Sequence, residues 1–168
     1  MTNRKIAYTG LLVALAFIFS YVEFLIPISI GIPGVKLGLA NLVVIVAIYT
    51  IGTKNAFILS AIRILLVALT FGNLASLLYS FAGGSLSFLV MALARKTGLF
   101  STTGVSLLGG VFHNIGQILI AMVMLETTRL IYYLPVLMVA GIVSGILIGI
   151  LGAMITERVQ GSLKYCME

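Results

Sequence analysis

Long apolar runs alternate with short breaks along the whole chain. The first run, Ile6 to Ile26, is long enough at about 1.5 Å per residue to cross a bilayer core of about 30 Å. Five further runs follow, separated by segments that contain glycine, proline, threonine or basic residues, which end or interrupt helices. The pattern predicts six transmembrane helices, at residues 6–26, 35–51, 55–69, 74–93, 103–125 and 133–155.

Two of these predicted helices differ from the rest. The runs at residues 35–51 and 55–69 are short for a full crossing, which indicates little tilt, capping by loops or a locally thinned bilayer. The break before the first of them, Pro27 to Gly34, is itself apolar. We therefore expect this loop to pack down onto the protein.

The composition assigns the chain to the membrane. Of its 168 residues, 61% are hydrophobic and only 8% are charged, and the mean hydropathy is +1.25. A soluble domain usually has about a quarter charged residues, which cover its water-facing surface. The sequence therefore predicts an all-α integral membrane protein with one domain, residues 1–168, in a lipid bilayer. We expect a multi-pass protein of the bacterial cytoplasmic membrane.

The distribution of basic residues predicts the orientation. The net charge of +6 would suggest nucleic acid in a soluble protein. In a membrane protein it indicates which side faces the cytoplasm, because cytoplasmic segments carry the excess of lysine and arginine. With both termini in the cytoplasm, outside segments hold Lys36 and Arg129. Inside segments then hold the larger set, Arg4, Lys5, Lys54, Arg95, Lys96, Arg158 and Lys164. We therefore predict two cytoplasmic termini and no nucleic-acid partner.

The stretch from Gly109 to Gln117 places His113, Asn114 and Gln117 in an otherwise apolar segment. At about 100° per residue, the three polar side chains fall on one side of a helix. They either make interhelical hydrogen bonds, worth about 0.6 kcal/mol each in membrane bundles, or they line a polar cavity. Three such side chains on one arc favour the cavity. A lone histidine with no acidic neighbour in sequence is weak evidence for a proton relay.

Arg63 is the costliest residue in the chain. Arginine at the centre of a membrane helix costs about 2.5–3.5 kcal/mol on insertion scales, so it should face the bundle interior and have a partner. Glu23 is the only carboxylate within a predicted membrane segment. We therefore predict an ion pair between Glu23 and Arg63. That pair could fix helix packing, or Arg63 could bind a ligand.

Other polar groups lie toward the same half of the predicted bundle. Asn41 belongs to the second predicted helix, Asn73 starts the fourth, and Lys36 lies near the outer surface. In the predicted topology these groups converge with the previous ones on an outward-facing site. Its predicted lining residues are Lys36, Asn41, Arg63, Asn73, His113, Asn114 and Gln117.

Small residues mark two helix faces. In the last predicted helix, Gly141, Gly145 and Gly149 recur every four residues, which permits close approach of another backbone. We predict that this face packs inside the protein. In the first predicted helix, a comparable face begins at the cytoplasmic surface and could receive a helix of a partner protein. Its residues are Ala7, Gly10 and Ala14.

Several chemistries are excluded by the residues that the sequence lacks. Aspartate is absent, Cys166 is the single cysteine and His113 the single histidine. Aspartate pairs, disulfides and cysteine or multi-histidine metal sites are therefore ruled out. No glycine-rich phosphate loop followed by lysine and serine or threonine is present. We predict no enzymatic activity, no cofactor and no metal, and any uphill transport would need ions or another subunit as its energy source.

Several segments resemble a known family. The run Arg4 to Ala16 is similar to the first helix of S components, the substrate-binding subunits of energy-coupling factor transporters. The segments Pro33–Asn41, Arg63–Val67, Phe71–Asn73, Ser80–Gly84 and Gly109–Gln117 resemble, in that order, the Gx transporter family, often labelled heptaprenyl diphosphate synthase component I. The resemblance covers almost the whole chain.

The resemblance implies an S-component-like bundle that captures a small solute, such as a micronutrient or cofactor precursor, from outside. It also implies a transmembrane coupling subunit and ATPase subunits as partners. The family's second label implies a non-catalytic membrane accessory of heptaprenyl diphosphate or isoprenoid-quinone synthesis. Prenyl diphosphate synthases use aspartate-rich motifs, which this chain lacks. A third interpretation is an ion-coupled transporter that acts alone, although the six helices show no clear repeat of two halves.

Overall fold

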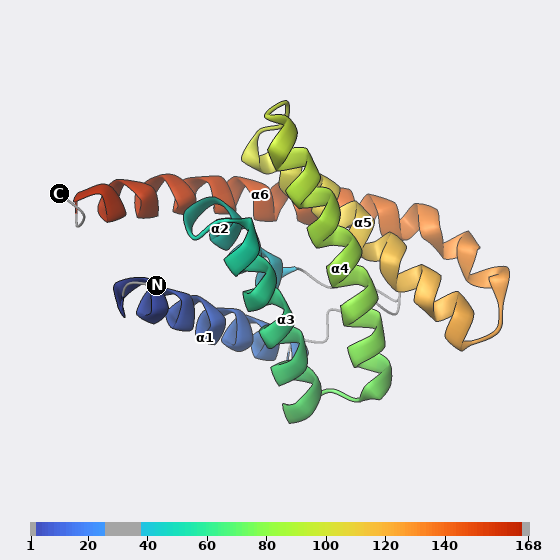
Figure 1. The fold of residues 1–168 in the computed structure, drawn as a ribbon. Coiled ribbons are helices and arrows are strands. Elements are labelled where there is room, and N and C mark those ends of the chain that lie inside the picture. The colour runs from blue at the N-terminus through green and yellow to red at the C-terminus, as the bar shows by residue number, and fades with distance from the viewer. Residues whose placement is uncertain (1–2, 26–37, 166–168) are drawn as a thin grey trace.

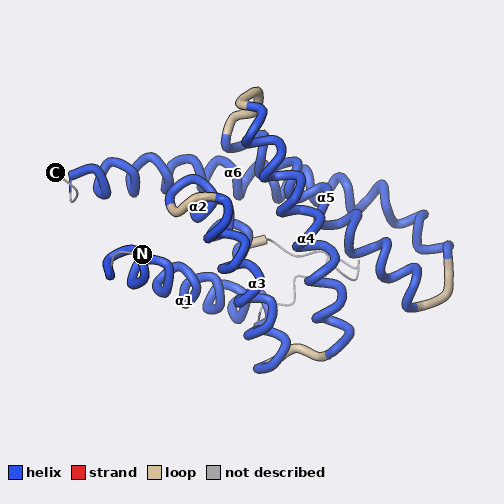
Figure 2. The backbone as a smooth tube through the Cα atoms, in the orientation of Figure 1, coloured by secondary structure: helices blue, strands red, loops and turns tan. Residues whose placement is uncertain are grey.

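The computed structural model describes residues 3–25 and 38–165, and these residues are almost entirely helical (Figures 1 and 2). Five of the helices are long and apolar enough to cross a membrane, which confirms the predicted helical membrane protein. The elements are α1 (Asn3–Leu25), α2 (Leu39–Thr50), α3 (Thr53–Thr70), α4 (Leu74–Thr97), α5 (Thr102–Met124), the 3-10 helix η1 (Thr128–Tyr133) and α6 (Leu134–Tyr165).

The helices pack in a closed order that differs from their order in the chain. Helix α1 packs on α2 and α3, α3 packs on α4, α4 on α5 and α5 on α6, and α6 returns to α2. The two chain ends lie on the same side in Figure 1, where α1 begins and α6 ends.

Helix α2 is the only one of the six described α-helices that is not long enough to cross a membrane. Its 12 residues span about 18 Å at about 1.5 Å per residue, which is too short to cross the bilayer core. Every residue from Leu42 to Ile48 is buried, because α1, α3 and α6 surround the helix. The predicted crossing at residues 35–51 is therefore a short inner helix where it is described. Its surface contributes to the core and not to the lipid-facing side.

Two other predicted boundaries were wrong. Helix α4 continues to Thr97 and ends at Gly98, whose φ of 69° is a conformation that glycine adopts without strain. The basic residues Arg95 and Lys96 belong to its last turn, where they complement the helix dipole. Helix α6 continues ten residues beyond the predicted end to Tyr165, and its 32 residues exceed the thickness of a bilayer core. No proline interrupts this extension.

Glycines bring α4, α5 and α6 into close contact. A methyl group added to Gly145 of α6 would lie 2.7 Å from Leu107 Cα of α5. One added to Gly116 of α5 would lie 2.7 Å from the carbonyl oxygen of Ala82 in α4. The predicted internal packing of the α6 glycines is therefore confirmed. Without side chains at these positions, the three backbones approach closely along their length.

Candidate functional site

The start of α2 lies inside the bundle and is held by a carboxylate from α1. Glu23 Oε1 accepts hydrogen bonds from the backbone N–H groups of Gly38, at 2.5 Å, and Leu39, at 3.1 Å. The first N–H groups of a helix have no partner within it, and a negative charge is favourable at this end. Glu23 therefore caps α2 from a neighbouring helix. Gly38 has a φ of 81°, which a glycine adopts without strain.

Arg63 belongs to α3 and contacts α1. Its Nη1 donates a hydrogen bond to Ser20 Oγ at 3.4 Å, and Ser20 in turn donates to the carbonyl oxygen of Ala16 at 2.9 Å. Arg63 and Glu23 interact electrostatically. Their hydrogen bonds in the described structure go to other partners, so a direct ion pair between Glu23 and Arg63 stays a prediction. Arg63 Nε is buried and has no hydrogen-bond partner there.

The polar arc on α5 is divided between two neighbouring helices. His113 and Gln117 lie against α4, where a methyl group on Gly83 would be 2.8 Å from Gln117 Cγ and 3.1 Å from His113 Cε1. Asn114 is buried and faces α6, where its Nδ2 donates to the carbonyl oxygen of Leu137 at 2.6 Å. In the described structure the three side chains therefore make helix contacts on two sides of α5.

The remaining predicted residues have three different placements. Asn73 is exposed and caps α4, because its side chain accepts the backbone N–H of Ser76 at 2.7 Å while the hydroxyl of Ser76 accepts the N–H of Asn73. Lys36 lies outside the described residues. Asn41 lines a cleft between α2, α4, α5 and α6. The predicted lining residues that the structure describes therefore lie at several separate places in the bundle. Ligand binding by them stays a prediction.

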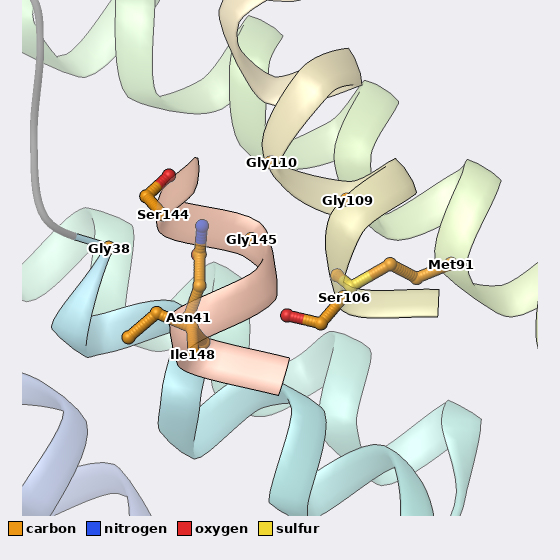
Figure 3. Close-up of a pocket in the computed structure, with 9 residues that line it drawn as sticks. All are labelled: Gly38, Asn41, Met91, Ser106, Gly109, Gly110, Ser144, Gly145 and Ile148. Atoms are coloured by element: carbon orange, nitrogen blue, oxygen red, sulfur yellow. The ribbon is translucent and has the colours of Figure 1, made fainter. Parts of the chain in front are cut away.

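The cleft lined by Asn41 is the candidate site. Figure 3 shows the Asn41 side chain extending from α2 toward Ser144 and Gly145 of α6, with the Ser106 hydroxyl directed into the same space from α5. The cleft has a cavity volume of about 20 Å³, room for one water-sized group, within about 270 Å³ of space between atoms that includes open solvent. Its remaining lining residues are Gly38, Met91, Gly109, Gly110 and Ile148. It can therefore offer hydrogen bonds from the amide of Asn41 and the hydroxyl of Ser106, whereas the Ser144 hydroxyl already donates to the carbonyl oxygen of Gly141 at 3.4 Å.

Sequence reasoning overlooked several residues around α2. The guanidinium of Arg95 donates from Nη1 to the carbonyl oxygen of Ile48 and, at 3.2 Å, to Thr53 Oγ1. It also lies over the ring of Tyr49, 4.8 Å from the centroid. Gln160 Nε2 donates to the carbonyl oxygen of Tyr49 at 3.0 Å. The only sequence signal was that the predicted crossing at residues 35–51 was short for a full crossing.

A comparison with known protein families identifies the family of this chain. The family model described as heptaprenyl diphosphate synthase component I matches residues 12–155, most of the chain. The chain belongs to this family. No curated protein and no solved structure matches it.

In this member of the heptaprenyl diphosphate synthase component I family, the small-residue face of α1 points outward. Ala7, Gly10 and Ala14 are exposed, and a methyl group on Gly10 would have no neighbour within 4 Å.

Among the described residues, no cluster of three or more histidine, cysteine or acidic side chains could hold a metal ion. The polar side chains of the candidate site are those of Asn41, Ser106 and Ser144.

Proposed function

We propose that this family member is a membrane solute-binding subunit, an S component of an energy-coupling factor importer. It would capture a small micronutrient or cofactor precursor from the extracellular side. The observation that supports this proposal is the mostly apolar cleft beside α2, which carries three polar side chains in a strongly apolar bundle. Small-molecule sites are concave, mostly apolar and carry a few placed polar groups. Asn41, Ser106 and Ser144 are such groups.

The short inner helix supports the same proposal. Because α2 spans about 18 Å, its first residues lie within the thickness of the bundle. A recess at the start of such a helix can admit a solute from one side. Non-helical backbone at membrane depth is tolerated where it is buried in protein or lines a cavity. Gly38, the residue before α2, meets that condition because it lines the cleft, and Glu23 accepts its N–H group.

The outward face of α1 is the proposed surface for the transmembrane coupling subunit. Ala7, Gly10 and Ala14 leave space for a close helix-to-helix approach. ATPase subunits would supply the energy, because the chain has no phosphate-binding loop. An Ala14→Leu variant should fold normally and lose co-purification with the coupling subunit. Leu11→Ala, another change at an exposed position of α1, provides the control for a general loss of surface area.

The solute-binding proposal is tested by native mass spectrometry of the purified protein. A retained small molecule is expected on the wild type, and Asn41→Leu should release it while leaving the fold intact. Lys96→Met is the control, because Lys96 is exposed in the last turn of α4 and is not a predicted lining residue. Absence of any bound or transported solute in cells that contain all subunits would contradict the proposal.

A second function is favoured by the family description. A non-catalytic membrane accessory could support heptaprenyl diphosphate or isoprenoid-quinone synthesis, and the absence of aspartate argues against a catalytic role by aspartate-held magnesium. The rate and product length of a soluble prenyl synthase, measured with and without this protein in lipid vesicles, test the alternative. An unchanged rate and product length would exclude it.

A further inference from the structure

The innermost part of the cleft beside α2 has the size of one water molecule. Its cavity volume is about 20 Å³. A cavity must offer roughly 10–15 Å³ to hold one water molecule, and the site must also supply polar partners. The space around the cleft includes open solvent, so a small molecule can reach it from outside.

Two polar side chains at the cleft make no hydrogen bond to any residue that the structure describes. One is the amide of Asn41 on α2, and the other is the hydroxyl of Ser106 on α5. Ser106 is only 5% exposed. A buried polar group without a partner is destabilising. Both side chains therefore favour a molecule between the helices that can form hydrogen bonds with them.

A third group, the hydroxyl of Ser144 on α6, can take part as an acceptor. Its hydrogen is directed to the carbonyl oxygen of Gly141 at 3.4 Å. The two lone pairs of the hydroxyl oxygen stay available. Buried water molecules in proteins typically make about three hydrogen bonds, with a range of 2–4. The three polar side chains that line the cleft supply this number (Figure 3).

Water fits these groups better than an apolar occupant of the same size. The rest of the cleft wall is mostly apolar and includes Met91 and Ile148. A lipid methyl group would match that part of the wall, but it would leave the amide and the hydroxyl of the cleft unsatisfied. A water molecule both donates and accepts, as an amide and a hydroxyl do.

We propose that one ordered water molecule binds in this cleft and bridges α2, α5 and α6 through Asn41, Ser106 and Ser144. It links the short inner helix to two helices whose backbones are in close contact at Gly145. A water-mediated hydrogen bond is nearly as favourable in enthalpy as a direct one. The inference concerns the protein without a solute and does not depend on the proposed solute-binding function.

An experimental structure at a resolution that shows ordered water tests the site directly. In the wild type we expect one water within about 2.7–3.2 Å of both the Asn41 amide and the Ser106 hydroxyl. The double variant Asn41→Leu/Ser106→Ala should lose it. A lipid chain, the ammonium group of Lys36 or a direct bond between Asn41 and Ser106 in its place would overturn the inference. So would the absence of this water where other buried waters are visible.

A double-mutant cycle tests whether the water couples the helices. Asn41→Leu and Ser106→Ala are made singly and together, and denaturant-dependent unfolding gives the unfolding equilibrium constant of each variant. Because the two side chains share one water, we expect their effects to be non-additive, with a coupling of about threefold in that constant. Additive effects of the two changes would contradict the bridge.

Two further variants make the cycle specific. Ser60 is a buried hydroxyl on α3, 6% exposed and outside the cleft lining, so Ser60→Ala should be additive with Asn41→Leu. Lys36 lies outside the described residues, and Lys36→Met should leave the coupling between Asn41 and Ser106 unchanged. A coupling that disappears in Lys36→Met, or one of equal size with Ser60→Ala, would overturn the inference.

Discussion

The carboxylate of Glu23 accepts the backbone N–H of Gly38 at 2.5 Å, and through it α1 holds the first turn of the buried helix α2. At the opposite end of α2, Arg95 of α4 binds the carbonyl oxygen of Ile48. A short helix inside a membrane protein exposes unpaired N–H and carbonyl groups within a region that lacks water to satisfy them. An anion at the N-terminus and a cation at the C-terminus satisfy both ends and complement the helix dipole.

Removal of the Glu23 cap should destabilise the protein. In Glu23→Leu, the N–H groups of Gly38 and Leu39 lose their shared acceptor, which costs about 1–3 kcal/mol when such groups stay buried. Glu23→Gln keeps an acceptor oxygen and should lose less. Thermal unfolding in detergent measures both variants. Equal stability of Glu23→Leu and the wild type would show that the cap contributes nothing.

The other end of α2 gives a parallel prediction with a built-in control. Arg95→Met removes the bonds to Ile48 and Thr53 and the contact with the Tyr49 ring, so we expect a loss of roughly 2 kcal/mol. Arg95→Lys should recover only part of this, because lysine lacks the planar fork of donors. The adjacent Lys96→Met changes an exposed charge and should have little effect. Denaturant-dependent unfolding distinguishes these outcomes.

The contact between α5 and α6 should be sensitive to a single methyl group. Gly145→Ala places a carbon 2.7 Å from Leu107 Cα, and the backbones must separate, at a cost of about 1–3 kcal/mol. Gly161→Ala adds the same group to the same helix at an open position and should be neutral or stabilising by up to about 1 kcal/mol. A melting temperature lowered in both variants alike would contradict the packing explanation.

The hydrogen bond from Asn114 to Leu137 should contribute modestly to stability. Interhelical hydrogen bonds in membrane bundles average about 0.6 kcal/mol and reach about 1.7 kcal/mol. Because Asn114 is buried at a 2.6 Å contact, we expect Asn114→Leu to fall in the upper part of this range. Unfolding by increasing denaturant measures the loss. Leu119→Met, at an exposed position of the same helix, is the control.

Much of the fold was predictable from local pattern. Run length and composition predicted six helices, and the spacing of Gly141, Gly145 and Gly149 predicted the close packing of α6. The end of α6 was placed too early because the apolar run stops near Ile155, whereas the helix continues to Tyr165. A helix can continue through polar residues as long as no proline interrupts its backbone hydrogen bonds, and residues 156–165 contain no proline.

The candidate site was much less predictable. Angular position on α5 placed His113, Asn114 and Gln117 within one arc, but such an arc can face two neighbouring helices. The structure places Asn114 against α6 and the other two against α4. Ser144 of the cleft was visible in the sequence only as a residue beside the packing glycines. Its role as a lining residue depends on the rotation of α6 relative to α2.

The sequence by itself determined the membrane location, the helix count and the exclusion of aspartate chemistry, because these follow from composition and from the length of apolar runs. Only the tertiary structure decided that α2 is enclosed and that Glu23 and Arg95 hold its two ends. It also decided that a cleft lined by Asn41, Ser106 and Ser144 opens beside this helix. The physical reason is that these features arise between residues far apart in the chain. Their pairing is set by how whole helices pack, which no local pattern specifies.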